Sequence, residues 1–538
     1  MPKVISIFDT TLRDGTQGEG ISLSAEDKLK IAQKLDTLGV QYIEGGNPGS
    51  NNKDIEFFER VKHLNLKAKI TAFGSTRRKN SLAETDVSLN RIVESGVPVA
   101  TLVGKSWDFH VHTALQTTLE ENLAMIYDSF VYLKNKGLET IFDAEHFFDG
   151  YKNNPEYAMA VLKKAEAAGV NWIVLCDTNG GTLPNEIYDI VSKVCADIST
   201  PVGIHTHNDC ELAVANSLAA VQAGATQVQG TINGYGERCG NANLCSIIPN
   251  LQIKLNYRCL SDEQLQSLTG VARYISEIAN VHMPVNQPYV GNAAFAHKGG
   301  IHVSAIMKDS KTYEHIVPEL VGNKQRILVS ELAGQSNLLY KAKELNLNLN
   351  MESSQTKAII DQIKDMEHKG YQFEAADASL ELLLRKAGGI VEEIFTLDSF
   401  KILVEKTADQ AVISEAIVKL KVQGETVYTV AEGNGPVNAL DNAVRKGLLQ
   451  FYPDIVNLHL SDYKVRVIDE RDATAAKVRV LIESTDYQNT WTTVGVSENV
   501  IEASWEALMD SIRYGLIGKT RVSSTKEDNR ERIGLVNH

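Results

Sequence analysis

The sequence predicts an α/β fold with an N-terminal (β/α)8 TIM barrel, helical linker subdomains and a C-terminal α+β domain with duplicated βββα units. Three changes of pattern along the chain predict it. Short apolar runs first alternate with stretches of helical periodicity, long helical patterns follow, and two sets of three strand-like runs and a helix come last. These patterns divide the chain into the barrel, the linker subdomains, the α+β domain and a disordered tail, over residues 1–270, 271–395, 396–519 and 520–538.

Eight short runs rich in apolar and β-branched residues are the candidate barrel strands. Ser24 and Asp27 mark the start of a helix after the first run, and Gly39 lies just past its end. Eight strand–helix units suit a TIM barrel. An open doubly wound sheet is the alternative, but the G-x-G-x-x-G turn expected after its first strand is absent. The candidate strands are Val4–Thr10, Tyr42–Gly46, Lys69–Ser75, Val99–Lys105, Thr140–Phe147, Trp172–Thr178, Val202–His207 and Gln227–Ile232.

The middle of the chain changes to longer helical patterns, over Asp262–Ile278 and Thr356–Lys369. Between them, the segment Pro284–Gly322 is rich in polar groups and too long for a passive linker. Its candidate functional side chains are His297, His302, Tyr313 and His315.

A weak internal duplication organises the C-terminal part, because each half has three strand-like runs followed by a helix. Tyr428 and Trp491 take matching places, as do Val437 and Val500, at a spacing of 63 residues. The first half consists of Ser399–Lys406, Ala411–Gln423, Thr426–Glu432 and the helix Val437–Gln450. The second half consists of Tyr463–Asp469, Ala476–Thr485, Thr490–Ser497 and the helix Val500–Leu516.

The composition is that of an ordinary globular protein, with 43% hydrophobic and 23% charged residues, which excludes a disordered or fibrous chain. The 54 basic and 68 acidic side chains give a net charge of −14, so we expect no nucleic-acid partner. No apolar run reaches membrane-spanning length, and the first residues lack the features of a signal peptide. We therefore expect a cytoplasmic protein with no membrane partner, whose 6 cysteines are reduced thiols.

Polar side chains follow the first and seventh candidate strands, where the active groups of a barrel lie. Arg13 and Asp14 follow the first strand, and His205 and His207 end the seventh. Residues i and i+2 of a strand share a face, so both imidazoles can face one point that Asp14 also reaches. Two imidazoles and one carboxylate suit a catalytic divalent metal with open positions. The alternatives are a surface ion pair of Arg13 with Asp14 and a pair of buried, hydrogen-bonded histidines.

Other candidate strands also end in polar groups that face the barrel mouth. Glu44 ends the second, Glu145 the fifth and Thr178 the sixth. A carboxylate there can fix an arginine or a histidine, act as an acid or base, or simply cap the following helix. The glycine-rich run Gly234–Asn241 follows the eighth strand and permits close backbone approach to a ligand. It can hold a phosphate-bearing cofactor, add an amide ligand to the metal, or be an ordinary turn.

Two segments together resemble the signatures of the DRE-TIM metallolyase family, which includes the 2-isopropylmalate and homocitrate synthases. The first is Leu12-Arg-Asp-Gly-x-Gln17, with Lys28 eleven residues beyond it. The second is His205-x-His-Asn-Asp209 followed by Ala213-Val-Ala215, with Glu211 where the family usually has glycine. The resemblance covers nearly the whole chain and implies a metal-dependent acyltransferase that acts on a 2-oxo acid.

Three further segments resemble the branch of this family that condenses acetyl-CoA with pyruvate to give (R)-citramalate for isoleucine biosynthesis. They are Glu44-Gly-Gly-Asn-Pro-Gly-Ser-Asn-Asn-Lys-Asp54, Phe73-Gly-Ser-Thr-Arg-Arg78 and Lys105-Ser-Trp-Asp108. Synthesis of 2-isopropylmalate or homocitrate from a larger 2-oxo acid is the alternative, because one methylene changes binding by only ~1–3 kcal/mol. A metal-dependent aldolase or lyase and a non-enzymatic ligand sensor are the remaining alternatives.

The resemblance also implies a role for each candidate residue. The implied ligands of a divalent metal (Mn²⁺ or Mg²⁺, with Zn²⁺ as a third candidate) are Asp14, His205, His207 and Asn241. Arg13 matches the arginine that stabilises oxyanion charge, and the implied substrate-binding residues are Arg13, Glu44 and Thr178. The implied catalytic residues are Arg13, Glu145, His302 and Tyr313, with His297 as the alternative to His302. Family members of this layout are homodimers in which the middle segment of one chain completes the site of the other.

The C-terminal duplication resembles the allosteric domain of isopropylmalate synthase, which binds the end product of its pathway. The resemblance implies that residues 396–519 form a regulatory domain with isoleucine as its effector. Helix starts near Gly435–Val437 and Asn499–Val500 favour the carboxylate of an amino acid, through free N–H groups and the helix dipole.

Overall fold

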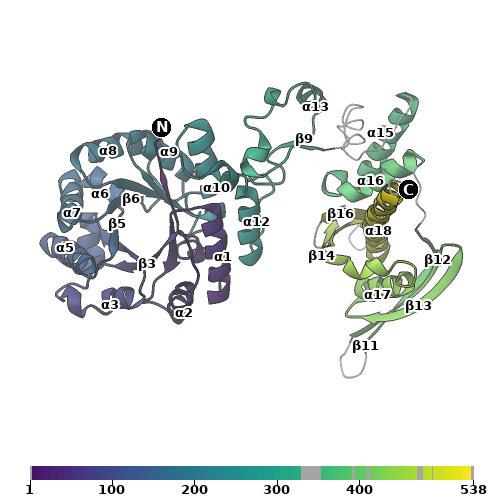
Figure 1. Ribbon diagram of the computed structural model, residues 1–538, viewed down its shortest axis with the longest axis horizontal. Coiled ribbons are helices and arrows are strands. Elements are labelled where there is room, and N and C mark those ends of the chain that lie inside the picture. The colour runs from purple at the N-terminus through teal and green to yellow at the C-terminus, as the bar shows by residue number, and fades with distance from the viewer. Residues whose placement is uncertain are drawn as a thin grey trace. The chain divides into compact units, whose positions relative to one another are not determined.

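The computed structural model of the 538-residue chain describes residues 3–328, 353–389, 394–406, 412–468, 476–486 and 489–534. The chain divides into two compact units (Figure 1). The first unit consists of Met1–Phe295 and Glu314–Gln325, and the second of Ala296–Tyr313 and Arg326–His538. The barrel lies in the first unit, and the duplicated domain lies in the second.

Eight parallel strands of the first unit form a closed barrel in sequence order. The ring closes where β8 pairs with β1, with Gly230 opposite Asp9. The predicted TIM barrel is confirmed, and each strand begins and ends within two residues of its predicted bounds. The strands are β1 (Ser6–Asp9), β2 (Tyr42–Gly46), β3 (Lys69–Ser75), β4 (Val99–Lys105), β5 (Glu139–Glu145), β6 (Trp172–Asp177), β7 (Val202–Thr206) and β8 (Gln227–Gly230).

Helices surround this ring of strands (Figure 1). The predicted first helix begins at the predicted cap, because the Ser24 hydroxyl accepts from the Asp27 N–H and the Asp27 carboxylate accepts from the Ser24 N–H. Gly39 ends it with a φ of 92°. The helices are α1 (Ala25–Leu38), α2 (Asn52–Val61), α3 (Val87–Glu94), α4 (Asp108–His110), α5 (Leu119–Asn135), α6 (Phe147–Asn153), α7 (Pro155–Ala168), α8 (Pro184–Asp197), α9 (Ala213–Ala223) and α10 (Leu244–Pro249).

The single helix predicted over Asp262–Ile278 is two helices, α11 (Asp262–Leu265) and α12 (Leu268–Ile278). The Ser267 hydroxyl donates to the backbone carbonyl of Gln264 at 2.7 Å. A short hydroxyl side chain that bonds to the neighbouring backbone favours a helix end over a helix interior, and this local competition is why the helix breaks here.

The second unit begins with a short parallel pair, β9 (Ala296–His297) and β10 (Arg326–Ile327), with α13 (Gly300–Ile306) between them in sequence. Two helices follow, α15 (Ser353–His368) and α16 (Asp377–Ala387). They pack on the last sheet of the chain, which contains Val494. The apolar cluster that joins them consists of Ile359, Ile363, Phe373, Ala376, Leu380, Leu384 and Val494.

Two three-stranded antiparallel sheets, each followed by a helix, form the rest of this unit and confirm the predicted duplication. The first consists of β11 (Thr396–Lys406), β12 (Val412–Val422), β13 (Glu425–Gly433) and α17 (Pro436–Leu448). The second consists of β14 (His459–Val467), β15 (Val478–Thr485), β16 (Thr490–Ser497) and α18 (Val500–Gly534). The two halves share one apolar core.

The two halves match at a spacing of 64 residues, one more than predicted. The equivalent positions are Thr429 and Thr493, Ala443 and Ala507, and the first helical residues Pro436 and Val500. In each half the threonine hydroxyl donates to the alanine carbonyl, at 2.8 and 2.6 Å. The predicted match of Tyr428 with Trp491 is wrong, because Tyr428 is 65% exposed and Trp491 is 7% exposed. A slip of one residue along a strand moves every side chain to the opposite face.

The C-terminal helix α18 is given through Gly534 and therefore includes residues 520–534 of the tail predicted to be disordered. This stretch has few apolar residues, which is why the sequence predicts no packing for it, but its Lys, Glu and Arg residues have good helix propensity. Residues 535–538 lie outside the described residues. Within the parts of the chain that the structure describes, no helix has the length and apolar character of a membrane span.

Candidate metal centre at the barrel mouth

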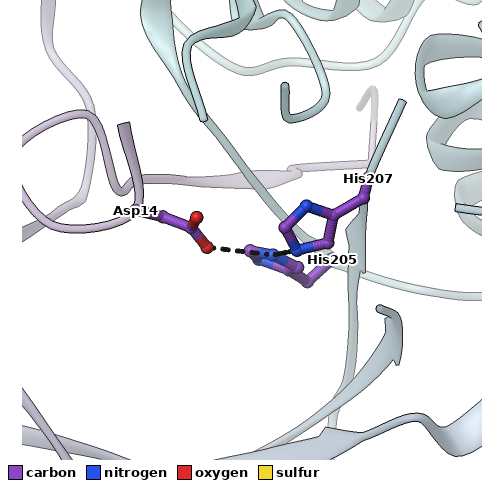
Figure 2. Close-up of side chains that lie close together, drawn as sticks. All are labelled: Asp14, His205 and His207. Atoms are coloured by element: carbon purple, nitrogen blue, oxygen red, sulfur yellow. Dashed lines mark hydrogen bonds and ion pairs between the residues drawn. The ribbon is translucent and has the colours of Figure 1, made fainter. Parts of the chain in front are cut away.

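Three buried side chains meet at the carboxyl end of the barrel strands, as the sequence predicts (Figure 2). The Asp14 Oδ2 atom lies 3.4 Å from His205 Nε2, and His205 Nε2 lies 3.3 Å from His207 Nε2. One ligand atom from each of the three residues falls within 4.8 Å of the others. In the described part of the chain this is the one such group of three or more His, Cys, Asp and Glu side chains.

The strand order of the barrel produces this meeting. β8 pairs with β1 on one side and with β7 on the other, so β1 and β7 are two strands apart in the ring. Asp14 lies in the turn after β1, while His205 lies in β7 and His207 directly follows it. The two histidines are two positions apart in extended chain, so their rings turn to the same side.

The three side chains fit a divalent cation. Two nitrogens at about 2.1 Å from one ion, at angles of roughly 90–110°, lie about 3.0–3.4 Å apart, which matches the facing Nε2 atoms. Two imidazole nitrogens that face each other hold either a proton or a cation between their lone pairs. Asp14 Oδ1 is in addition buried without a hydrogen-bond partner among the described residues. Carboxylate and imidazole are the donors of catalytic metal sites with open positions.

Asn241, the predicted fourth ligand, lies beside His207, with which it forms an isolated antiparallel bridge. Its Nδ2 donates to the carbonyl of Tyr235 at 3.1 Å, and its Oδ1 is buried with no partner in the described structure. Gly236 makes this approach possible, because a Cβ there would lie 2.2 Å from Asn241 Nδ2. An amide oxygen left unpaired in this position is suited to a cation.

The surroundings of Asp14 and His207 favour the protonation states in which these side chains bind a metal, an anionic carboxylate and a neutral imidazole. Burial opposes ionisation of Asp14, but Arg13 and His205 outweigh it and hold the pKa of its carboxyl well below the usual range. Burial and the neighbouring His205 lower the pKa of His207 to about 4. Burial also acts against the charged form of His205, but the Asp14 carboxylate outweighs it and raises the pKa of His205. Asp14 is therefore anionic and His207 neutral at neutral pH.

Arg13 is held rigidly beside the three candidate ligands. Its Nε donates to Glu44 Oε2 at 2.7 Å, its Nη1 lies 3.1 Å from Asp14 Oδ2, and its guanidinium stacks 4.0 Å above the Phe73 ring. Glu44 is fully buried and also accepts from the Thr10 hydroxyl at 2.5 Å. Glu44, predicted to bind substrate, thus contacts Arg13 directly. Among the described residues these contacts use Nε and Nη1, which leaves Nη2 for a further acceptor.

Glu145 and Thr178 lie at the carboxyl ends of β5 and β6, on the predicted side of the barrel. Glu145 forms an ion pair with Lys105. The Thr178 hydroxyl accepts from the backbone N–H of His146 at 2.9 Å. Both side chains therefore already have protein partners, and their predicted roles stay predictions.

His302 and Tyr313 belong to the second unit, whereas the three candidate ligands belong to the first. Within that unit their rings stack at 29°, with centroids 4.1 Å apart. His297, the alternative to His302, lies on β9 of the same unit. His302 and Tyr313 are therefore close partners within the second unit, and the predicted catalytic roles of these residues stay predictions.

Sequence reasoning missed three residues of the site, Phe73, Asp143 and Gln229. Phe73 covers the Arg13 guanidinium, while Gln229 accepts from His205 Nδ1 through Oε1 and donates to Asp143 through Nε2. A signal for two of them exists in the sequence, because Asp143 and Gln229 are polar residues inside strands that otherwise bury apolar side chains. A buried polar side chain in a barrel strand near the mouth indicates a partner inside the barrel.

Comparison with known proteins gives matches along almost the entire chain. A family model described as HMGL-like matches residues 4–275, one described as the homocitrate synthase post-HMGL domain matches 289–371, and one described as the LeuA allosteric (dimerisation) domain matches 374–516. The three models succeed one another in the order of the barrel, the linker subdomains and the duplicated domain.

Curated relatives match over the same length. The (R)-citramalate synthase of Aquifex aeolicus is 57% identical over 96% of this chain and 98% of its own length, and that of Geobacter sulfurreducens is 53% identical over 97% and 100%. The 2-isopropylmalate synthase of Methanocaldococcus jannaschii is 34% identical over 95% of each chain. The chain belongs to the (R)-citramalate synthase family, a family of metal-dependent acyltransferases built on the HMGL-like barrel.

Proposed function

We propose that this chain condenses acetyl-CoA with pyruvate and hydrolyses the resulting thioester to (R)-citramalate and CoA. The observation that carries the proposal is the cluster of Asp14, His205 and His207 with the Arg13 guanidinium fixed beside it. The names of the relatives support pyruvate as the 2-oxo acid. We further propose Asp14, His205, His207 and Asn241 as the ligands of a divalent cation, Mn²⁺ or Mg²⁺.

The reaction needs one electrophile to be activated and negative charge to be stabilised. A divalent cation bound there supplies a Lewis acid for the keto group of the 2-oxo acid. Arg13 donates toward the oxygen on which charge develops, and it needs little reorganisation because Glu44 and Phe73 already fix its plane. Glu44 is a positioning residue in this scheme, and Thr178 lines the substrate pocket at the end of β6.

Proton transfer completes the chemistry. The methyl carbon of acetyl-CoA loses a proton and attacks the keto carbon of pyruvate, and water then cleaves the thioester and releases the CoA thiol. We propose that Glu145, His302 and Tyr313 carry these protons, with the last two supplied by the partner subunit of a homodimer. An imidazole stacked on a phenol is a suitable pair for this task, because both side chains can donate and accept a hydrogen bond to the reacting groups.

A panel of 2-oxo acids tests the substrate. We expect CoA thiol release from acetyl-CoA with pyruvate to exceed that with 2-oxoisovalerate and 2-oxoglutarate by at least about tenfold in kcat/KM, because a pocket shaped for a methyl group excludes the larger side chains. A stereospecific assay of the product checks for (R)-citramalate. Preference for 2-oxoisovalerate or 2-oxoglutarate would instead assign 2-isopropylmalate or homocitrate synthesis.

We also propose that residues 396–519 bind isoleucine and inhibit the barrel. The match to a LeuA allosteric (dimerisation) domain and the duplicated βββα architecture support this. Two matching helix starts, after Gly435 in α17 and after Asn499 in α18, favour a carboxylate through the helix dipole and first-turn N–H groups, although Pro436 has no N–H and the Ile501 N–H already donates to Asn499 Oδ1. No catalytic residue is proposed in this domain, so regulation is its simplest role.

Isoleucine is therefore expected to inhibit the full chain and to have no effect on a chain that lacks residues 396–538. The measurements are CoA release across an isoleucine titration, isoleucine binding by calorimetry, and oligomeric state by light scattering. Leucine and valine serve as matched control ligands. Absence of inhibition in the full chain, or equal inhibition of a soluble truncated dimer, contradicts the proposal. Low activity of the truncated chain alone does not bear on it, because removal of a domain can lower activity without any change in isoleucine binding.

A further inference from the structure

A chain of hydrogen bonds crosses the barrel interior from His205 to a carboxylate on the far side. His205 Nδ1 lies 3.0 Å from Gln229 Oε1, and Gln229 Nε2 donates to Asp143 Oδ1 at 3.1 Å. The three residues come from β7, β8 and β5, and Asp143 stands 86 positions before Gln229 in sequence. Each is buried, with at most 5% of the residue exposed.

The donors and acceptors of this chain fix one arrangement of His205. Burial raises the pKa of Asp143 to about 7, and an oxygen of this carboxyl group accepts from the NH₂ group of Gln229 whether or not the carboxyl carries a proton. The amide oxygen of Gln229 then faces His205 and accepts from Nδ1–H. A neutral imidazole protonated on Nδ1 presents a lone pair on Nε2, the atom that faces Asp14 and His207.

We propose that Gln229 and Asp143 are positioning residues that hold His205 in the tautomer and orientation needed to bind a divalent cation. The inference rests on the metal site proposed above and adds two residues to it. The alternative is that the two side chains only satisfy each other in the barrel core. Metal affinity separates the two roles, because a purely structural pair changes thermal stability without changing how the folded site binds a cation.

The variant Gln229→Leu tests the proposal, because it removes both hydrogen bonds and keeps a buried side chain of similar size. Mn²⁺ affinity of the full-length chain, measured by calorimetry, is expected to fall about 10- to 100-fold, the usual effect of losing such a partner. The visible spectrum of the Co²⁺-loaded chain is expected to change as well, because it reports the ligands directly.

Gln227→Leu is the matched control. Gln227 lies two positions earlier on β8, is also fully buried, and neither atom of its amide has a hydrogen-bond partner among the described residues. Its replacement is expected to leave Mn²⁺ affinity within about twofold, because it touches no ligand.

Asp143→Leu provides a second test that does not depend on Gln229→Leu folding. It leaves Gln229 beside His205 but removes the acceptor of its NH₂ group, and we expect Mn²⁺ binding to weaken by about three- to tenfold. Asp143→Asn is the matched control, because its amide oxygen still accepts from Gln229 while the carboxyl group is lost as in Asp143→Leu. This control is expected to stay within about twofold of the native affinity.

The outcomes separate this inference from the metal site itself. If the native chain binds no Mn²⁺, both fail. If the native chain binds Mn²⁺ and folded Gln229→Leu binds it equally well with an unchanged Co²⁺ spectrum, the metal site stands and the positioning role is wrong. If Gln229→Leu does not fold, the Asp143 variants decide, and Mn²⁺ binding by Asp143→Leu that is as tight as by Asp143→Asn overturns the proposal.

Discussion

The variants His207→Ala and Asp14→Ala are expected to lose at least about a thousandfold in kcat while the barrel stays folded. Each removes one of the three proposed ligand side chains, whose atoms lie within 4.8 Å of one another. A cation then keeps fewer protein ligands and loses the fixed position that activates the keto group. The fold is expected to survive because both side chains lie at the catalytic end of the barrel, outside the apolar core.

Two measurements check this result. CoA thiol release gives kcat, and elemental analysis of the dialysed protein gives the metal bound per chain. Exposed residues of the same barrel, in the variants His63→Ala and Asp189→Ala, are the matched controls and are expected to keep native metal content and turnover. Native metal content in either His207→Ala or Asp14→Ala would remove that residue from the ligand set.

The barrel and the cluster of Asp14, His205 and His207 could be predicted because their signals are local in the sequence. The alternation of apolar runs and helical stretches gives each strand to within two residues, since one buried strand and one amphipathic helix are each specified by neighbouring residues. His205 and His207 share a face because they are two positions apart on a strand. Asp14 joins them because the closed ring places β1 two strands from β7.

What the sequence did not predict depends on contacts between distant residues. The contact of Gln229 with Asp143 crosses the barrel, and no local pattern relates two strands that are not neighbours. Glu44 was predicted as a substrate ligand, but its position under Arg13 follows from packing between β2 and the turn after β1. The predicted alignment of the two halves is wrong by one residue, because apolar residues occur on both faces of β13. Only their burial in the structure shows that Val427 faces the core and Tyr428 faces solvent.

Arg13→Lys is expected to be nearly as damaging as Arg13→Ala, with a loss of at least about tenfold in kcat for lysine, equivalent to ~1.4 kcal/mol of transition-state stabilisation. The native guanidinium bonds Glu44 through Nε and Asp14 through Nη1 while its plane lies 4.0 Å above Phe73. The lysine ammonium is one compact charged group at the end of a flexible side chain. It cannot bond to both carboxylates and to a developing oxyanion at the same time. The positive charge alone is therefore not enough.

Arg77→Lys separates this chemical effect from the general cost of replacing a buried arginine. Arg77 is also buried and also bonds two carboxylates, Asp128 and Glu121, but it contacts none of the proposed ligands. Its replacement is expected to lower the melting temperature while kcat stays within about twofold of native, because only packing and ion pairing are lost. Arg13→Lys is expected to do the reverse, with native metal content and reduced kcat. If Arg13→Lys instead keeps more than a tenth of native kcat, a positive charge near the cation is sufficient. The fixed orientation of the Arg13 guanidinium, held by Glu44 and Phe73, then has no part in stabilising the oxyanion.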